Sequence, residues 1–392
     1  MPETIIAGYA RTPFAKFLGQ LAQSKSTELG AHAARHAMER AGVAPGEVDA
    51  VVVGQVLQAT VGQNPPRQTA VAAGVPMSVP ALGISAVCLS GAEAIVTGHR
   101  MIQLGEADVV LAVGQESMSL APHAAPMRAG SKFGDTSLID TMQFDGLTDA
   151  FDRVAMGAST DEHNGRFEIT REQQDEFAAA SHARLARAQA DGTLDGEIVP
   201  FEAKAGRKTV TVSADDGLRA DTTVESLASL RPAFTPDGTV TAGNASQITD
   251  GAAAVVLVSD AYAKQQGLTG LARIVSTGFV AGPDVSLHSQ PADAIEQALE
   301  RAGRATSDLQ AVEINEAFAA VGVASTRQLG VDPEIVNANG GAIALGHPIG
   351  ASGARIIGHL ARRLQQLGTG SLGAAGICGG GGQGTGVVLE AI

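Results

Sequence analysis

The stretch HAMERAGVAPGEVDAVVVGQ, residues 36–55, decides the fold because it recurs 261 positions later as QALERAGRATSDLQAVEINE, residues 297–316. The identities all fall in one register, and in the first copy they include Ala37, Glu39, Arg40, Ala41, Gly42, Ala50 and Val51. Agreement this dense in a single register is not expected by chance. An internal repeat of this kind predicts a duplicated architecture.

The repeat continues beyond these two segments. SGAEAIVTGHRMIQLGEADVVLAVG (90–114) resembles SGARIIGHLARRLQQLGTGSLGAAG (352–376), with one extra residue of offset. Each copy therefore predicts a helix, a strand, a buried helix, a strand and a final strand. Alternating strands and helices indicate layered α/β halves.

The two copies differ in how their last strands are connected. In the second copy, SLGAAGI (371–377) and GVVLEAI (386–392) are joined by a short glycine-rich turn. In the first copy, VVLAVG (109–114) and AAAVVLVSD (252–260) are separated by about 137 residues. The first half therefore carries a large insertion.

Helix boundaries can be predicted on both sides of this insertion. A first helix is expected from about Thr27 to Ala41, ending at Gly42 in a left-handed cap. Inside the insertion, Thr170 and Gln173 form a capping box before the helix REQQDEFAAASHARLARAQA, which is expected to end at Asp191-Gly192.

Composition excludes several classes of function. The formal net charge of -14 argues against a nucleic-acid surface, and an anionic ligand would need a local basic patch. Two cysteines 290 positions apart suggest reduced thiols in the cytoplasm rather than a disulfide framework. The start of the chain, MPETIIAGYARTPF, predicts no secretory signal, and no apolar run is long enough to predict a membrane span.

Cys88, in VPALGISAVCLSGAEAIVTG (79–98), lies between an apolar run and a predicted buried helix. A lone buried cysteine is most often a small packing residue. At a helix N-terminus, however, unpaired amides and the helix dipole stabilise a thiolate, so we expect a lowered pKa and a nucleophile. The same amides could hold an oxyanion.

Two further segments end in polar residues. His347, in NANGGAIALGHPIGASGAR (337–355), precedes the second-copy helix as Cys88 precedes the first, so facing halves would pair the two side chains. A thiol with an imidazole is a minimal activated nucleophile, although a lone histidine is usually structural. Asn315 and Glu316 follow an apolar strand, where either ligand binding or helix capping is expected.

The segment GICGGGGQGTG (376–386) contains the pattern G-x-G-x-x-G. A dinucleotide site needs a helix after these glycines, but only eight residues follow Gly384 and they predict a strand. We therefore reject that function and keep Cys378, at a strand end, as a candidate. The two distant cysteines lack the spacing of metal ligands, so no metal site is expected.

Together these segments resemble the thiolase family over essentially the whole chain. The matching stretches are ARTPF, VCLSG, GQESMS, DGLTDAF, RPAF, TVTAGNAS, DGAAAV, NEAFA, NANGGAIALGHPIGASGAR and CGGGGQG, all in order. The resemblance implies an α/β fold of duplicated αβαβα-layered halves with an inserted loop domain. We expect the N-terminal half over residues 1–118 and 250–269, the insertion over 119–249, and the C-terminal half over 270–392.

The resemblance is nearest to the biosynthetic type, whose activity is the reversible condensation of two acetyl-CoA molecules. It implies that Cys88 takes up the acetyl group, with His347 as its base. It further implies that Cys378 is a second acid/base and that Asn315 positions a water beside His347 in one oxyanion hole. The amides of Cys88 and Gly380 would form the other oxyanion hole.

Coenzyme A contacts are implied by position in the same family. They are Arg219, Ser226, Phe234 and Ser246, with Leu147, Met156 and Phe318 along the pantetheine channel. Lys204, Arg207 and Lys208 either extend the basic patch around Arg219 or form a solvated face.

The implied partners are acyl-CoA substrates, with coenzyme A and acetyl-CoA as substrates rather than permanent cofactors. Residues 120–142 resemble a loop that joins thiolase dimers into homotetramers, and fatty acid metabolism is the implied setting. SAVCLSG, Ala155, Gln247 and LHSQP (287–291) depart from the usual pattern and leave acyl preference open.

The alternative function is a degradative 3-ketoacyl-CoA thiolase of broader chain length. A decarboxylating ketosynthase would leave Cys378 without a role. A non-catalytic acyl-CoA-binding protein would be free to lose Cys88, His347 or Cys378, yet all three are present. The physiological direction stays open.

Overall fold

The computed structural model describes residues 2–392, and its centre is one continuous mixed β-sheet. The strands follow the order β12-β13-β14-β11-β1-β10-β5-β3-β4, with the short β2 paired to β10. Their bounds are β1 Thr4–Arg11, β2 Ala15–Lys16, β3 Ala50–Gly54, β4 Ala81–Ile84, β5 Val109–Glu116, β10 Thr249–Ser259, β11 Ala272–Ala281, β12 Ala311–Ile314, β13 Leu372–Gly379 and β14 Gln383–Ala391.

The pairing within this sheet repeats once. In the first half, β3 runs parallel to β5, β5 pairs antiparallel with β10, and β10 pairs antiparallel with β1. The second half repeats this pattern: β12 runs parallel to β13, β13 pairs antiparallel with β14, and β14 pairs antiparallel with β11. The halves join where Thr4 of β1 lies opposite Ile274 of β11. The predicted duplication is confirmed.

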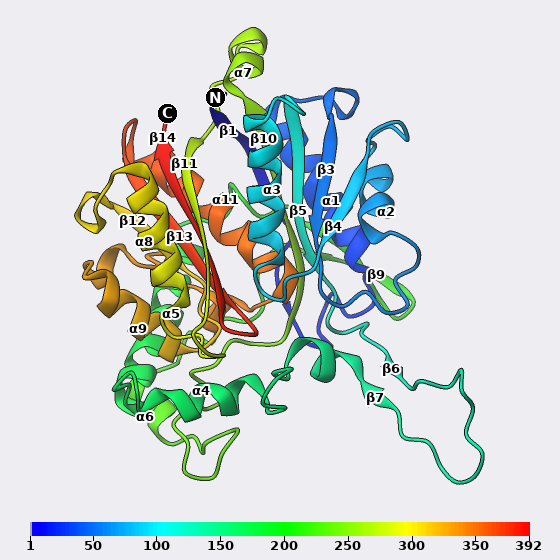
Figure 1. Ribbon diagram of the computed structural model, residues 1–392, viewed down its shortest axis with the longest axis vertical. Helices are drawn as coiled ribbons and strands as arrows, with labels where there is room; N and C mark the ends of the chain where they lie inside the picture. Colours follow the sequence, from blue (N-terminus) through cyan, green and yellow to red (C-terminus); the bar gives the residue numbers. More distant parts are fainter. Residues whose placement is uncertain (1) are drawn as a thin grey trace.

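The helices follow the same duplication and complete the layers. Figure 1 shows α3 and α11 in the middle of the molecule, where one apolar cluster joins them to strands of both halves. α1 packs on the outer face of the first half with α2, and α8 packs on the outer face of the second with α9. The bounds are α1 Ser26–Ala41, α2 Pro65–Ala72, α3 Ser90–Gln103, α8 Gln290–Ala302, α9 Ala319–Leu329 and α11 Ile349–Leu367.

Helix ends agree with the sequence patterns. α1 ends at Ala41, and Gly42 follows with a φ of 69° in the left-handed region. In α5 (Arg171–Ala190), the Thr170 hydroxyl accepts from the Gln173 amide and the Gln173 side chain accepts from the Thr170 amide. Local capping chemistry therefore sets these boundaries, as expected from the residues alone.

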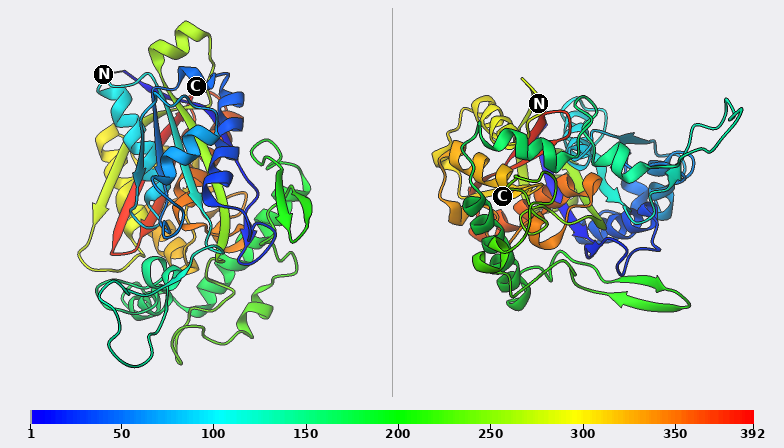
Figure 2. Two further views of the ribbon diagram at one scale, coloured as in Figure 1. Left: turned by 90° about the vertical axis from the view of Figure 1, so that its right-hand side faces the viewer. Right: turned by 90° about the horizontal axis from the view of Figure 1, so that it is seen from below.

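Most of the insertion lies at one end of the molecule, opposite both chain termini, while its β8–β9 hairpin lies along the side of the first half (Figure 1). The β6–β7 loop and the β8–β9 hairpin stand off the body in both views of Figure 2. The elements of the insertion are β6 His123–Ala124, β7 Ile139–Asp140, a π-helical turn Met142–Gly146, α4 Met156–Asn164, α5, β8 Phe201–Ala205, β9 Lys208–Val212 and α6 Val224–Ala228.

A buried ion cluster holds the insertion to the first half. The guanidinium of Arg11, at the end of β1, is fully buried. Its Nε donates to Glu197 at 2.7 Å, and its two terminal nitrogens donate to Asp215 at 2.6 and 2.8 Å. A buried charge is tolerated only when it is paired in this way.

The other helical segments are short: α7 Asp260–Gln266, α10 Ala342–Leu345 and the 3₁₀ turns Pro45–Glu47, Thr306–Asp308 and Pro333–Ile335. Among residues 2–392, no helix has both the length and the apolar character needed to span a membrane.

Candidate active site

Cys88 lies in a tight turn between β4 and α3. Val87 adopts a φ of 49°, which non-glycine residues rarely do, and this turns the chain sharply just before the cysteine. The Ser90 hydroxyl fixes the turn, because it accepts from the Ala86 amide at 2.9 Å and donates to the Val87 carbonyl at 2.6 Å. The partly exposed Cys88 therefore lies just before the first turn of α3.

His347 faces Cys88 from the second half, with its Nε2 3.2 Å from the Cys88 Sγ. The histidine backbone is fixed by hydrogen bonds from its amide to the Gln247 carbonyl (3.0 Å) and the Thr249 hydroxyl (3.1 Å). Its Nδ1 lies 2.6 Å from the hydroxyl of Ser352. When Nδ1–H donates to Ser352, Nε2 is left free to accept the thiol proton.

The contact between Cys88 and His347 depends on close packing of α3 against α11. A Cβ on Gly91 would lie 2.7 Å from the Gly350 carbonyl oxygen, so any side chain there would push the helices apart. Glycine at positions 91 and 350 therefore lets the two helix starts, and hence the thiol and imidazole, meet.

The electrostatics at rest differ from our expectation. Burial raises the pKa of Cys88 to about 12, and the charge of Glu116 adds to this, whereas the amides of Cys88 and Gly380 oppose it. The expected lowering at the helix N-terminus is therefore wrong. Apolar side chains around the sulfur, including Leu57 and Ile349, outweigh the helix end.

The pKa of His347 is shifted in the opposite direction, downward. Burial lowers its pKa to about 4, with a contribution from Arg355. An uncharged thiol beside an uncharged imidazole is thus the resting state at neutral pH. Ionisation then requires transfer of the proton from sulfur to Nε2.

The glycine-rich turn brings two more candidates to this point. Cys378, near the end of β13, is fully buried, and burial together with the neighbouring Cys88 raises its pKa above the ordinary value. The Gly380 amide acts on the Cys88 sulfur, as does the amide of Cys88 itself. Two backbone donors therefore favour negative charge on the Cys88 sulfur.

Asn315 is fully buried directly after β12. Its backbone amide donates to the Gly376 carbonyl on β13, but neither Oδ1 nor Nδ2 has a hydrogen-bond partner among residues 2–392. It does not cap α9, since the cap position belongs to Phe318. An orphaned buried amide is costly, so it marks a place for a water or ligand.

Glu316, by contrast, has a structural position. Its carboxylate accepts from the Ser181 hydroxyl, the Asn337 side chain and the Ile343 amide. It thereby joins α5 to the segment before His347.

A recess of about 460 Å³ opens onto the imidazole of His347. Its lining includes six of the seven predicted coenzyme A contacts: Arg219, Phe234, Ser246, Leu147, Met156 and Phe318. Ser226 is exposed on α6 and is not part of this lining. Lys16 also lines this recess. The sequence patterns did not identify it, because it is distant in the chain from the other lining residues.

The basic residues Lys204, Arg207 and Lys208 lie on or beside the β8–β9 hairpin and do not line the recess. Arg219 does line it, so the cationic patch there is formed by Arg219 and Lys16. For the hairpin lysines and arginine, the solvated-face interpretation is the better one.

A second recess, of about 360 Å³, lies on the other side of Met156. Met156 lines both recesses. Val87, the residue before Cys88, and Gly380 line it together with Phe144 and Phe151, whereas Cys88 itself is not among its lining residues.

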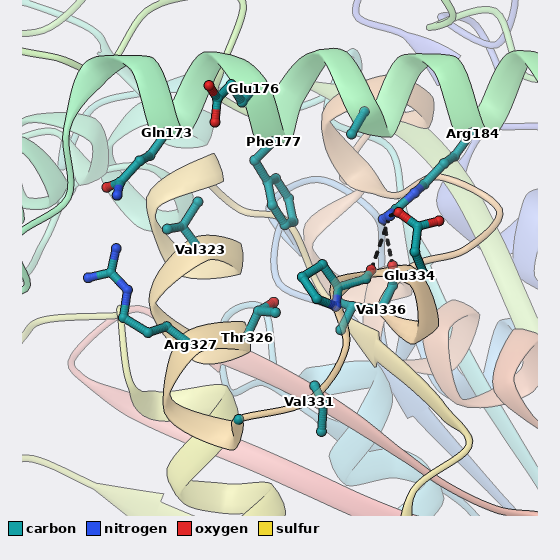
Figure 3. Close-up of a pocket in the computed structure, with 13 residues that line it drawn as sticks. Gln173, Glu176, Phe177, Arg184, Val323, Thr326, Arg327, Val331, Glu334 and Val336 are labelled. Carbon is teal, nitrogen blue, oxygen red and sulfur yellow. Dashed lines mark hydrogen bonds and ion pairs between the residues drawn. The ribbon is translucent and has the colours of Figure 1, made fainter.

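A larger recess, of about 610 Å³, lies between α5 and α9 (Figure 3). Phe177 and Val323 line its apolar floor, and Arg184 at its edge is engaged by the Val336 carbonyl and Glu334. Its lining residues include no cysteine or histidine in the part of the chain described. Size alone thus does not identify the reactive site.

Across residues 2–392, no group of three or more His, Cys, Asp or Glu side chains is arranged to hold an ion.

Comparison with known proteins assigns the family. Residues 4–261 match the thiolase N-terminal domain and residues 268–391 match the thiolase C-terminal domain. A probable acetyl-CoA acetyltransferase of Mycolicibacterium smegmatis is 52% identical over 98% of this chain and 100% of that protein. The acetyl-CoA acetyltransferase of Rhizobium meliloti is 47% identical over 99% of each. The crystal structure of the Bacillus anthracis acetyl-CoA acetyltransferase superposes with a TM-score of 0.96 at 40% identity, covering 100% of this chain and 99% of that one. The chain belongs to the thiolase family.

Proposed function

We propose that this protein is an acetyl-CoA C-acetyltransferase that condenses two acetyl-CoA molecules reversibly to acetoacetyl-CoA and coenzyme A. The observation that carries the proposal is the 3.2 Å approach of His347 Nε2 to Cys88 Sγ beside a second thiol, Cys378. Its close relatives are named for this activity.

The first half-reaction is acyl transfer to Cys88. Nε2 of His347 accepts the thiol proton as the sulfur attacks the carbonyl carbon of acetyl-CoA. The bond from that carbon to the coenzyme A sulfur breaks, and the leaving thiolate takes the proton from His347. The amides of Cys88 and Gly380 stabilise the oxygen of the acetyl-Cys88 thioester.

The second half-reaction needs a second base, because Cys88 is now acylated. Cys378, as its thiolate, removes a proton from the methyl group of a second acetyl-CoA, and the resulting carbanion attacks the acetyl carbon on Cys88. The carbon–sulfur bond to Cys88 then breaks, and the Cys88 thiolate takes up the proton that Cys378 removed. His347 and a water held by Asn315 stabilise the thioester oxygen of the incoming acetyl-CoA.

Coenzyme A would bind in the recess that leads to His347. Arg219 and Lys16 supply positive charge for its phosphates, and Phe234, Leu147, Met156 and Phe318 supply apolar walls for pantetheine. Ser226 would contact the ligand only at the outer end. No permanent cofactor is proposed.

The experiment is an acyl-chain profile of thiolysis by purified protein, run beside Cys88→Ala. We expect acetoacetyl-CoA to be the best substrate and the variant to be inactive. Absence of cleavage of every 3-ketoacyl-CoA by the wild type would overturn the enzyme assignment.

The alternative is a degradative 3-ketoacyl-CoA thiolase, and the 360 Å³ recess beyond Met156 favours it. This volume lies within the range of about 300–1,000 Å³ of small-molecule sites. Ala150, an exposed residue in its lining, offers a test. Ala150→Trp would fill the recess and remove cleavage of longer chains while sparing acetoacetyl-CoA, and Ala150→Ser is the matched control. If longer chains are poor substrates of the wild type, this alternative is excluded.

We also propose a homotetramer, cytoplasmic location and a role in fatty acid metabolism. The support for assembly is the protruding segment 120–142, where Phe133 is fully exposed and Leu138 is 64% exposed. Exposed apolar side chains on a protruding loop favour burial against another subunit. The domain division given above, 1–118 with 250–269, 119–249 and 270–392, belongs to the same proposal.

A further inference from the structure

Glu116, the last residue of β5, is fully buried beside the reactive centre but takes no part in the chemistry described above. Its carboxylate accepts three backbone hydrogen bonds. Leu57 donates to Oε1 at 3.1 Å, while Val56 and Gly350 donate to Oε2 at 3.1 and 3.0 Å. These donors come from both halves of the duplicated fold.

The donor set shows which form of the carboxyl group the site requires. All three partners are N–H groups, so the ionised carboxylate satisfies every one of them, whereas a protonated carboxyl would have an O–H with no acceptor. Burial raises the pKa of Glu116 to about 7, the three amides oppose that shift, and the nearby Asp250 adds to it. Its charge also acts on the Cys88 thiol.

The three donors hold two segments that carry the reactive pair. Gly350 lies in the first turn of α11, three residues after His347, and an anion at a helix start is favourable. Leu57 follows β3, and its side chain packs in one cluster with Ile349 and Cys88. The carboxylate therefore links the start of α11 to the end of β3 at the level of the thiol.

The start of α11 packs tightly against the Glu116 carboxylate. A Cβ on Gly350 would lie 2.8 Å from Glu116 Oε2 and 3.0 Å from Gln55 Cα. The helix start thus approaches the carboxylate as closely as a backbone without a side chain allows. A shift of the carboxylate would be transmitted to α11 rather than absorbed.

We propose that Glu116 is a positioning residue, which fixes the start of α11 against the end of β3 and thereby sets the approach of the His347 imidazole to the Cys88 thiol. The inference rests on the proposed function only in naming the reaction that needs His347 close to Cys88. It assigns Glu116 no direct contact with substrate.

Glutamine is the informative replacement, because it keeps the volume but has only one acceptor oxygen. Its NH₂ group would face the amide of Leu57, or those of Val56 and Gly350, donor against donor. Glu116→Gln is expected to lower kcat for acetoacetyl-CoA thiolysis about 10- to 100-fold, since misplacement of about 1 Å can cost about 100-fold. KM should change by less than about twofold, because the coenzyme A recess is untouched.

A second readout does not depend on turnover. Alkylation of Cys88 by iodoacetamide, followed on its peptide by mass spectrometry, should slow by a similar factor in Glu116→Gln, because it too needs His347 in place. Glu116→Asp, which keeps the charge and all acceptor oxygens, should recover part of both losses. Glu93→Gln is the control, since Glu93 is a buried carboxyl on α3 whose hydrogen bond comes from Thr385.

The control separates positioning from general stability. Both glutamine variants should lower the melting temperature, but Glu93→Gln should keep wild-type kcat and alkylation. The proposal is overturned if Glu116→Gln is folded and retains wild-type kcat and alkylation, or if Glu93→Gln loses both equally. Should Glu116→Gln not fold, Gly350→Ala decides by the same readouts. A wild type that cleaves no 3-ketoacyl-CoA would defeat the proposed function, while the alkylation series would still test Glu116.

Discussion

Replacing His347 by asparagine should leave the Cys88 thiol almost unreactive at neutral pH. The sulfur packs against apolar side chains, and burial raises its pKa to about 12. In the proposed reaction of the wild type, the thiol gives up its proton to Nε2, which lies 3.2 Å away. Asparagine cannot accept that proton, so the variant must ionise the thiol without a base.

The size of the effect follows from the thiol pKa. At about pH 7.5, a pKa of about 12 leaves about one thiol in 30,000 ionised, a cost of about 6 kcal/mol. An exposed cysteine with a pKa of about 8.5 is about one-tenth ionised at that pH. The variant should therefore alkylate about 3,000-fold more slowly than a free thiol.

The assay is the rate of iodoacetamide labelling of the Cys88 peptide as a function of pH, by mass spectrometry. In His347→Asn the rate should keep rising with pH well past 9, whereas the wild type should already react at neutral pH. His288→Asn, at a buried histidine elsewhere in the fold, is the matched control and should label like the wild type. Equal labelling of wild type and His347→Asn at about pH 7.5 would refute the reasoning.

Four further outcomes are expected. Cys378→Ala should still form acetyl-enzyme but lose condensation by about 100- to 10,000-fold, measured by acetoacetyl-CoA formation, and loss of acetylation would contradict the assignment. Ser352→Ala removes the 2.6 Å partner of His347 Nδ1, which should cost about 1.4 kcal/mol or tenfold in kcat; unchanged kcat would contradict this. Arg11→Met removes the buried partner of Asp215 and leaves Glu197 with His359 alone, and it should destabilise the fold by about 3–5 kcal/mol in urea unfolding. Burial lowers the pKa of His288 to about 3, so its contribution to the free energy of unfolding is present above about pH 6.5 and falls by up to about 1.4 kcal/mol per pH unit below it. His288→Gln should therefore show a weaker loss of stability in acid than the wild type, and an equal loss would refute that sign.

Much of the fold could be predicted because it depends on local or repeated patterns. The recurrence of residues 36–55 at 297–316 predicted matching halves, and the strand pairing has the same order in both. Gly42 predicted the end of α1 because a left-handed cap needs only local sequence. The repeat also placed Cys88 and His347 at equivalent helix starts, which is why their meeting could be expected.

What could not be predicted depends on surroundings assembled from distant segments. The helix start alone predicts a lowered pKa for Cys88. Apolar residues from distant segments, such as Leu57 and Ile349, pack around the cysteine, and this burial raises the pKa of its thiol. Glu116 was part of a matching stretch without any role, since its three donors come from two other segments. Lys16 likewise reaches the recess of Arg219 only through folding.

The most direct test of the account is to find the acetyl group. Wild-type protein is mixed with acetyl-CoA, quenched in acid and digested, and the acetylated peptide is identified by mass spectrometry beside Cys88→Ala and Cys378→Ala. The account predicts one acetyl group on the Cys88 peptide in the wild type and in Cys378→Ala, and none in Cys88→Ala. An acetyl group on Cys378, or active enzyme without acetyl-Cys88, would contradict it.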